Sequence, residues 1–125
     1  MIAAKKGYTA HARYIRMSPR KVRPIANQVR RKPYPEAMSI LGAMPHKGAM
    51  LLGKVVKSAA DNALFQNQQL DEEALYLRHI EINDGPRIKR YWARGRGRAD
   101  MLIKPMCHIS VAVEEIALAG DAGAE

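Results

Sequence analysis

Residues 85–98 read Gly85-Pro86-Arg87-Ile88-Lys89-Arg90-Tyr91-Trp92-Ala93-Arg94-Gly95-Arg96-Gly97-Arg98. The segment holds the chain's only tryptophan, beside a tyrosine, among six basic residues and no acidic one. Arginine binds phosphate through paired hydrogen bonds, aromatic rings stack on bases, and glycine lets a partner approach the backbone closely. Because the segment offers nothing to a hydrophobic core, it predicts an extended arm that orders only between segments of RNA. The alternative is a solvated, flexible loop with incidental charge.

Apolar patterns on either side of this segment predict two strands. In residues 75–82 the apolar positions change parity between Leu77 and Ile80, which predicts a β-bulge near Arg78. Residues 101–116 contain a more regular alternation of period two. We expect the two strands to pair antiparallel, with the basic segment joining them.

The N-terminal region predicts a strand over residues 8–15, followed by a helix. Ser18 suits the N-cap, and Pro19 suits the first helical position, where its missing N–H costs nothing. Pro24 predicts a kink or a late start, because proline inside a helix costs about 3 kcal/mol. One face of the helix is apolar and comprises Val22, Ile25, Ala26 and Val29. The opposite face is polar and comprises Arg20, Arg23, Asn27, Arg30 and Arg31.

Two further helices are expected before the strand pair. A short one opens at Pro35 and is ended by Pro45, and a longer one runs from about His46 to Gln66. The longer helix has a regular apolar stripe formed by Leu52, Val55, Val56, Ala59 and Ala63. The Ala/Gly-rich tail after Leu118 predicts disorder.

Length, net charge and cysteine content limit the number of domains, the class of partner and the cellular compartment. The 125 residues predict a single domain, and 21 Lys+Arg against 12 Asp+Glu give a formal charge of +9. The basic residues concentrate in two blocks without acids, residues 1–32 and 87–98. These blocks predict a polyanionic partner, nucleic acid before membrane. One cysteine, and no apolar run near the ~20 residues of a membrane span, favour the cytoplasm.

No pattern predicts catalysis, a metal site or a cofactor. Residues 48–55 approach the phosphate-binding pattern G-x-x-x-x-G-K-[ST], but Val55 lacks the hydroxyl that would bind magnesium. The four histidines and Cys107 have no metal-ligand spacing. The carboxylates Asp71, Glu72 and Glu73 are consecutive, as in a solvated turn. We therefore expect no enzyme.

Several segments carry a resemblance to a known family. They are Ala12-Arg13-Tyr14-Ile15-Arg16-Met17-Ser18-Pro19-Arg20-Lys21-Val22-Arg23, Lys57-Ser58-Ala59-Ala60-Asp61-Asn62-Ala63, Asp84-Gly85-Pro86, Ile88-Lys89-Arg90, Gly97-Arg98-Ala99-Asp100 and His108-Ile109-Ser110-Val111. In this order and spacing, over residues 8–116, the chain resembles the bacterial-type family twenty-two of large ribosomal subunit proteins.

The resemblance implies an α+β fold, in which three helices pack on a small antiparallel sheet and a long β-hairpin protrudes. The arm would span about residues 83–106, and its tip, around Lys89, Arg90, Tyr91 and Trp92, would face the polypeptide exit tunnel. The implied function is that of a structural constituent of the large subunit that binds its RNA and supports early assembly. The implied partners are large-subunit ribosomal RNA, neighbouring ribosomal proteins and the nascent polypeptide, with no membrane and no small-molecule substrate.

The residues expected to bind RNA are basic, and all but Lys104 lie in the two blocks. They are Arg13, Arg16, Arg20, Lys21, Arg23, Arg30, Arg31, Lys32, Arg87, Lys89, Arg90, Arg94, Arg96, Arg98 and Lys104. An alternative function is that of a free-standing regulatory module that binds RNA or DNA. A nucleotide-dependent enzyme built on residues 48–54 is a third, weaker one.

Overall fold

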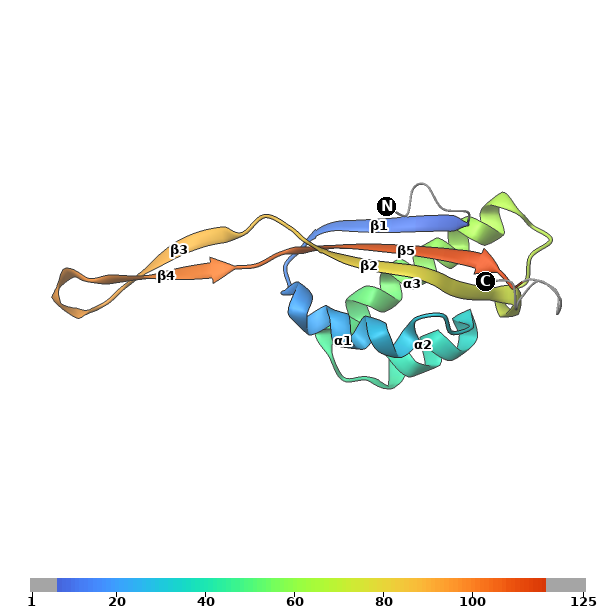
Figure 1. Cartoon of the computed structure of the whole chain (residues 1–125), viewed down its shortest axis with the longest axis horizontal. Helices are drawn as coiled ribbons and strands as arrows, with labels where there is room; N and C mark the ends of the chain where they lie inside the picture. Colours follow the sequence, from blue (N-terminus) through green and yellow to red (C-terminus); the bar gives the residue numbers. More distant parts are fainter. Residues whose placement is uncertain (1–6, 117–125) are drawn as a thin grey trace.

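The computed structural model describes residues 7–116 and has an α+β fold (Figure 1). A three-stranded antiparallel sheet of order β1-β5-β2 carries three helices, and a two-stranded hairpin, β3-β4, extends beyond it. The elements are β1 (Tyr8–Ile15), α1 (Pro19–Val29), α2 (Tyr34–Ala43), α3 (Lys47–Gln66), the 3-10 turn η2 (Glu72–Ala74), β2 (Leu75–Asp84), β3 (Ile88–Ala93), the 3-10 turn η3 (Gly95–Gly97), β4 (Ala99–Lys104) and β5 (Cys107–Glu115). The expected fold class is confirmed, whereas the tail after Leu118 lies outside the described residues.

Helix α1 begins where the sequence predicts. Pro19 is its first residue, and the predicted apolar stripe is buried. The side chain of Ser18 makes no capping hydrogen bond, although Ser18 is the N-cap residue. The late start predicted from Pro24 is wrong, because a single helix runs through this exposed residue. Burial of the stripe on both sides of Pro24 offsets the one backbone hydrogen bond that it removes.

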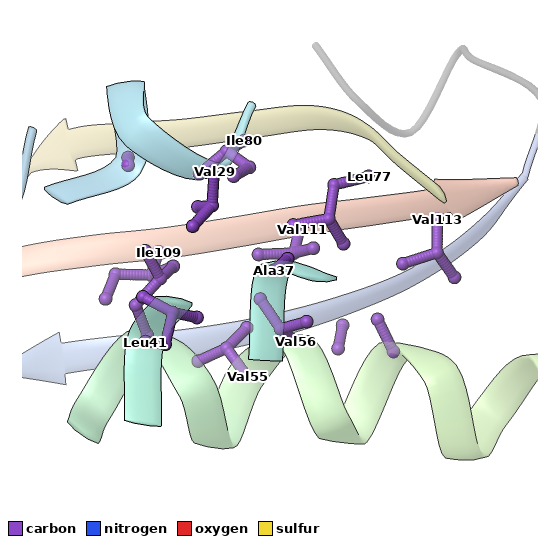
Figure 2. Packing of buried hydrophobic residues seen from close by; sticks show 14 of the residues in the cluster. Val29, Ala37, Leu41, Val55, Val56, Leu77, Ile80, Ile109, Val111 and Val113 are labelled. Carbon is purple, nitrogen blue, oxygen red and sulfur yellow. The ribbon is translucent and has the colours of Figure 1, made fainter. Parts of the chain in front are cut away.

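A single hydrophobic core joins the helices to the sheet. Figure 2 shows Val55 and Val56 of α3 on the same side of the sheet as Ile109 and Val111 of β5, with Leu41 of α2 beside them. The predicted stripe of α3 is buried along its whole length. Burying one such side chain stabilises the fold by roughly 1.5–3 kcal/mol, so this layer fixes the body from which the hairpin extends.

The predicted β-bulge in β2 is confirmed. Leu77 pairs with Val113 and His79 with Ala112, so that Arg78 is the extra residue. The bulge returns the apolar residues on both sides to the core face, where all four are buried: Leu75, Leu77, Ile80 and Ile82.

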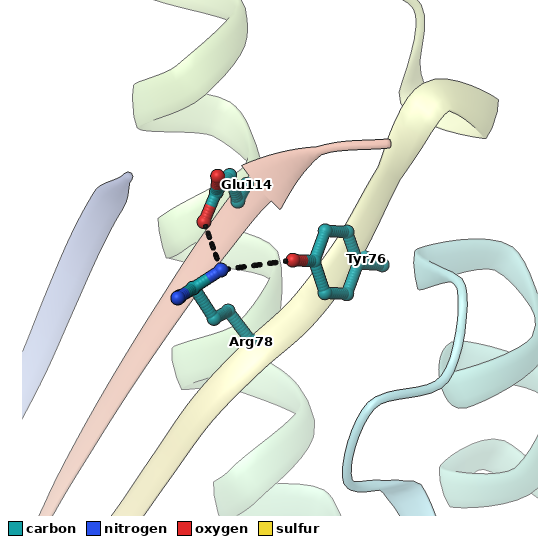
Figure 3. A network of polar contacts seen from close by, with 3 residues as sticks. All are labelled: Tyr76, Arg78 and Glu114. Atoms are coloured by element: carbon teal, nitrogen blue, oxygen red, sulfur yellow. Dashed lines mark hydrogen bonds and ion pairs between the residues drawn. The ribbon is translucent and has the colours of Figure 1, made fainter. Parts of the chain in front are cut away.

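The side chain of Arg78 joins a polar network on the sheet (Figure 3). One guanidinium nitrogen lies 3.2 Å from the Tyr76 hydroxyl and 3.0 Å from a carboxylate oxygen of Glu114. The side chains of Arg78 and Glu114 are each 25% exposed. The bulge residue thereby links β2 to β5 through side chains as well as through the backbone.

Candidate nucleic-acid interface

The hairpin β3-β4 has no core of its own. Six residue pairs join the strands, from Ile88 with Lys104 to Ala93 with Ala99. At about 3.3 Å per residue, six residues extend it by ~20 Å. Residues that pair across the ribbon point to the same side of it, and successive residues of one strand point to opposite sides. Arg90 and Trp92 therefore lie on one side, and Lys89 and Tyr91 lie on the other. Both sides therefore present cations together with aromatic rings.

The turn of the hairpin carries three of the predicted arginines. Arg94, Arg96 and Arg98 are all exposed, and the Arg94 backbone N–H donates to the Arg98 carbonyl oxygen at 2.7 Å. Arg96 and Gly97 have φ angles of 61° and 74°, so two left-handed residues reverse the chain. The guanidinium of Arg94 pairs with the Asp100 carboxylate at 2.5 Å. Arg96 and Arg98 therefore remain available to bind a partner at the end of the hairpin.

The four residues expected to form the tip do not lie in the turn of the hairpin. Lys89, Arg90, Tyr91 and Trp92 lie within β3, and the turn follows at residues 94–98. Tyr91 is 75% exposed and Trp92 is 56% exposed. The end of the hairpin is therefore cationic, and its aromatic rings lie along its shaft.

Close backbone packing forms the root of the hairpin. Gly85 donates its N–H to the Met106 carbonyl oxygen at 2.8 Å. A Cβ atom at position 85 would lie 3.2 Å from three atoms of Met106, two of them backbone atoms. The absence of a side chain at position 85 thus lets the two segments of the hairpin leave the sheet side by side. Residues 85–87 belong to neither β2 nor β3.

A cationic groove lies where the hairpin meets the body. It has a volume of about 710 Å³ and opens beside the first turns of α1 and α3, whose dipoles add positive potential. Its lining residues are Arg16, Met17, Ser18, Lys21, Lys47, Ile103, Lys104 and Pro105. Four of these are basic and none is acidic, so the groove suits a strand of phosphates.

A second hollow of about 310 Å³ adjoins this groove and shares Ser18, Ile103 and Pro105 with it. Arg20, Arg23 and Arg87 bring positive charge to it, while Asp84 brings the one carboxylate. Together the two hollows connect the N-terminal basic block to the basic hairpin. These blocks are far apart in the sequence.

Two predicted RNA-binding arginines also have partners within the body. Arg23 donates to the Ile82 carbonyl oxygen at 3.0 Å, and Arg30 donates to the Ile80 carbonyl oxygen at 2.5 Å. Both acceptors belong to β2, an outer strand of the sheet. These two side chains therefore attach α1 to the sheet, a role that the sequence pattern does not predict.

The other residues of the first block that are predicted to bind RNA lie before and after α1. Arg13 is exposed on β1, before the groove. Beyond α1, Arg31 is exposed and its backbone N–H donates to the Leu77 carbonyl oxygen at 3.0 Å. Lys32 lies 3.8 Å from Glu36 in an exposed ion pair. Among the described residues of this block, the basic ones that line the two hollows are Arg16, Arg20, Lys21 and Arg23.

Lys47 is a further basic residue of the site that the sequence pattern does not predict. It is the first residue of α3 and lines the cationic groove with Lys21 and Lys104. Nothing local in the sequence marks Lys47, because its role depends on how α3 packs beside the hairpin root.

Acidic residues gather at the opposite end of the sheet. Asp71, Glu72 and Glu73 precede β2, and Glu115 pairs with Leu75 at the start of that strand. The hairpin leaves the sheet from its other end (Figure 1). The groove and the hairpin thus lie at the end of the sheet opposite this acidic cluster.

The segment that approaches a phosphate-binding motif is helical. Residues 48–55 lie inside α3, and Gly48 is buried against α1. A Cβ atom there would lie 2.9 Å from Ile25 and 3.1 Å from Met17, so Gly48 serves helix packing. Among residues 7–116, no group of three or more His, Cys, Asp or Glu could hold a metal ion, and no helix is both long and apolar enough for a membrane span.

Comparisons with known proteins agree on one family. The family model described as Ribosomal protein L22p/L17e matches residues 10–114. The chain is 57% identical over 111 residues to large ribosomal subunit protein uL22 of Treponema denticola, covering 89% of this chain and 94% of that protein. It is 51% identical over 116 residues to the uL22 protein of Borrelia recurrentis, covering 93% of this chain and 97% of that protein.

Proposed function

The chain belongs to the ribosomal protein L22p/L17e family, a family of structural proteins without catalytic activity, and from this premise we propose how it works. It is a constituent of the large ribosomal subunit in the cytoplasm. Its groove and hairpin bind large-subunit ribosomal RNA, and its other partners are neighbouring ribosomal proteins and the nascent chain. The observation that carries this proposal is the cationic groove, which leads into an exposed, basic and aromatic hairpin.

The body and the hairpin have different roles in this proposal. The groove docks on RNA phosphates through Arg16, Lys21, Lys47 and Lys104, which surround a volume large enough for a backbone strand. The hairpin then inserts between RNA segments, where its cations meet phosphate and its rings meet bases. By contacting RNA segments that are distant from each other, the chain supports early assembly of the subunit.

The hairpin also reaches the wall of the polypeptide exit tunnel in this proposal. Lys89, Arg90, Tyr91 and Trp92 form the segment that lies at the tunnel wall, beside the nascent chain. Their placement on both sides of one ribbon supports this role, because one side can contact RNA while the other faces the lumen.

Salt dependence of RNA binding tests the role of the hairpin. Each phosphate neutralised adds roughly 0.7–0.9 to the magnitude of the slope of log affinity against log salt. The variant Arg96→Ala/Arg98→Ala removes two cations from the turn and leaves the Arg94–Asp100 ion pair intact. We expect weaker binding to purified large-subunit ribosomal RNA and a slope smaller in magnitude by about 1.5.

A matched control removes two exposed cations elsewhere. Lys54→Ala/Lys57→Ala changes the net charge equally, on the exposed face of α3. Its slope should stay closer to that of the unchanged chain. Equal slopes for both double variants would contradict a specific role for the hairpin.

A further inference from the structure

Tyr14 has a backbone conformation that bulky residues rarely adopt. Its φ angle is 59°, and it lies where the pairing of β1 with β5 shifts register, between Ala12 and Ile15. Asparagine or glycine would occupy this left-handed conformation at lower cost. The backbone conformation therefore does not explain why residue 14 is a tyrosine. The explanation lies in the contacts and the exposure of its ring.

His108 of β5 holds Tyr14 through two contacts. Its Nδ1 atom accepts a hydrogen bond from the Tyr14 backbone N–H at 3.1 Å, which requires the tautomer with its proton on Nε2. The two rings also meet edge to face, with centroids 5.0 Å apart and planes at 85°. Backbone and ring of Tyr14 are both fixed in advance of any partner.

The fixed ring nevertheless faces solvent, since Tyr14 is 62% exposed. Its neighbours Arg13 and Arg16 are exposed too, and residues 7–32 contain no carboxylate. Arg16 also lines the cationic groove at the hairpin root. An immobilised aromatic ring thus lies in a cationic stretch beside the proposed path of the RNA backbone.

We propose that Tyr14 is a stacking platform for one unpaired base of large-subunit ribosomal RNA, whose flanking phosphates meet Arg13 and Arg16. The proposal rests on the proposed function and adds a site to it. Aromatic side chains stack on unpaired bases of any sequence, and guanidinium groups bind the adjoining phosphates. The competing occupant is an apolar residue of a neighbouring protein, but the cations around Tyr14 favour a polyanion.

Two substitutions separate stacking from other effects. Tyr14→Phe keeps the aromatic face, whereas Tyr14→Asn removes it and suits the left-handed backbone. The probe is purified large-subunit ribosomal RNA, bound to the full chain at several salt concentrations. We expect Tyr14→Phe to bind as the unchanged chain does, and Tyr14→Asn to bind about tenfold more weakly. The salt slope should not change, because neither variant removes a charge.

Two controls exclude a general loss of structure. Thermal unfolding of Tyr14→Asn should occur no lower than that of Tyr14→Phe, because asparagine relieves the backbone. The matched control is Phe65→Asn near the end of α3, where an aromatic ring that is 83% exposed should not affect RNA binding.

The outcomes distinguish this proposal from the one on which it rests. Unaltered affinity for Tyr14→Asn, or an equal loss for Tyr14→Phe, would overturn the stacking platform and leave salt-dependent RNA binding in place. A loss that appears only when other large-subunit proteins are present would overturn it too, since Tyr14 would then contact a protein. If the unchanged chain fails to bind the RNA, the proposed function itself fails.

Discussion

The guanidinium of Arg30, at the end of α1, donates a hydrogen bond to the backbone carbonyl oxygen of Ile80 at 2.5 Å. Ile80 lies in β2, whose outer edge would otherwise leave backbone acceptors without strand partners. Arg23 makes the same kind of contact with Ile82, one repeat further along the strand. A basic helix thus closes the edge of the sheet while its other cations remain available to RNA.

Replacing Arg30 should destabilise the body even without RNA. Arg30→Met keeps an unbranched side chain but removes the donors, so we expect the free energy of unfolding to fall by about 1–2 kcal/mol. Urea denaturation of the free chain measures this. Arg20→Met, an exposed position on the same helix, serves as the control. Equal unfolding free energies for the two variants would mean that the contact with Ile80 adds no stability.

The contact between Arg78 and Glu114 gives a second prediction. Because both side chains are three-quarters buried, the pair is screened less than a surface ion pair. In a double-mutant cycle with Arg78→Met and Glu114→Gln, each single variant should lose about 1–2 kcal/mol, and the double variant less than their sum. Additive losses in urea denaturation would show that the two side chains are not coupled.

Most of the fold is predictable from sequence because local patterns determine it. The bulge at Arg78 follows from the change of parity between Leu77 and Ile80, since both must face one core. The start of α1 follows from Pro19. The edge contacts of Arg23 and Arg30 are not predictable in this way, because they join residues 59 and 50 positions apart. Only the packing of α1 against β2 brings these groups together.

The sequence predicts the chemical character of the site better than it predicts the positions of the residues in it. Composition identifies the hairpin as a cationic and aromatic arm, but not the position of its turn, which Arg96 and Gly97 set through positive φ angles. Lys47 is missed because the groove exists only after α3 packs beside the root of the hairpin. Tyr14 is likewise missed, since the contacts that hold it come from His108, 94 positions away.

Cys107 gives a prediction about pH and stability. Burial raises the pKa of its thiol, with opposing contributions from Arg23, which lowers it, and Asp84, which raises it. The folded state therefore holds this proton more tightly than the unfolded state does. The resulting stability is fully present below the unfolded thiol pKa of about 8.5, and it is lost as the pH rises through the folded pKa.

Unfolding free energies measured from pH 7 to pH 10 test this effect. The unchanged chain should lose more stability above about pH 8.5 than Cys107→Ala, which lacks the thiol. Tyr34, whose pKa burial also raises, is present in both chains and cancels in the comparison. Parallel curves for the two chains would contradict the prediction. In the folded protein the thiol should also react slowly with alkylating reagents, since it is buried and protonated.

The hairpin should become ordered only with RNA. An isolated two-stranded ribbon is at best marginally stable in water, and β3 and β4 bury none of their residues. In the free chain, we expect the amides of Lys89 to Ile103 that pair across the ribbon to exchange with solvent far faster than those of Ile109 to Val113 in β5. Binding to large-subunit ribosomal RNA should slow the hairpin amides at least tenfold and leave β5 unchanged, which hydrogen exchange with mass spectrometry can measure. Equal protection of both segments in the free chain would show that the hairpin holds its own structure and needs no RNA to do so.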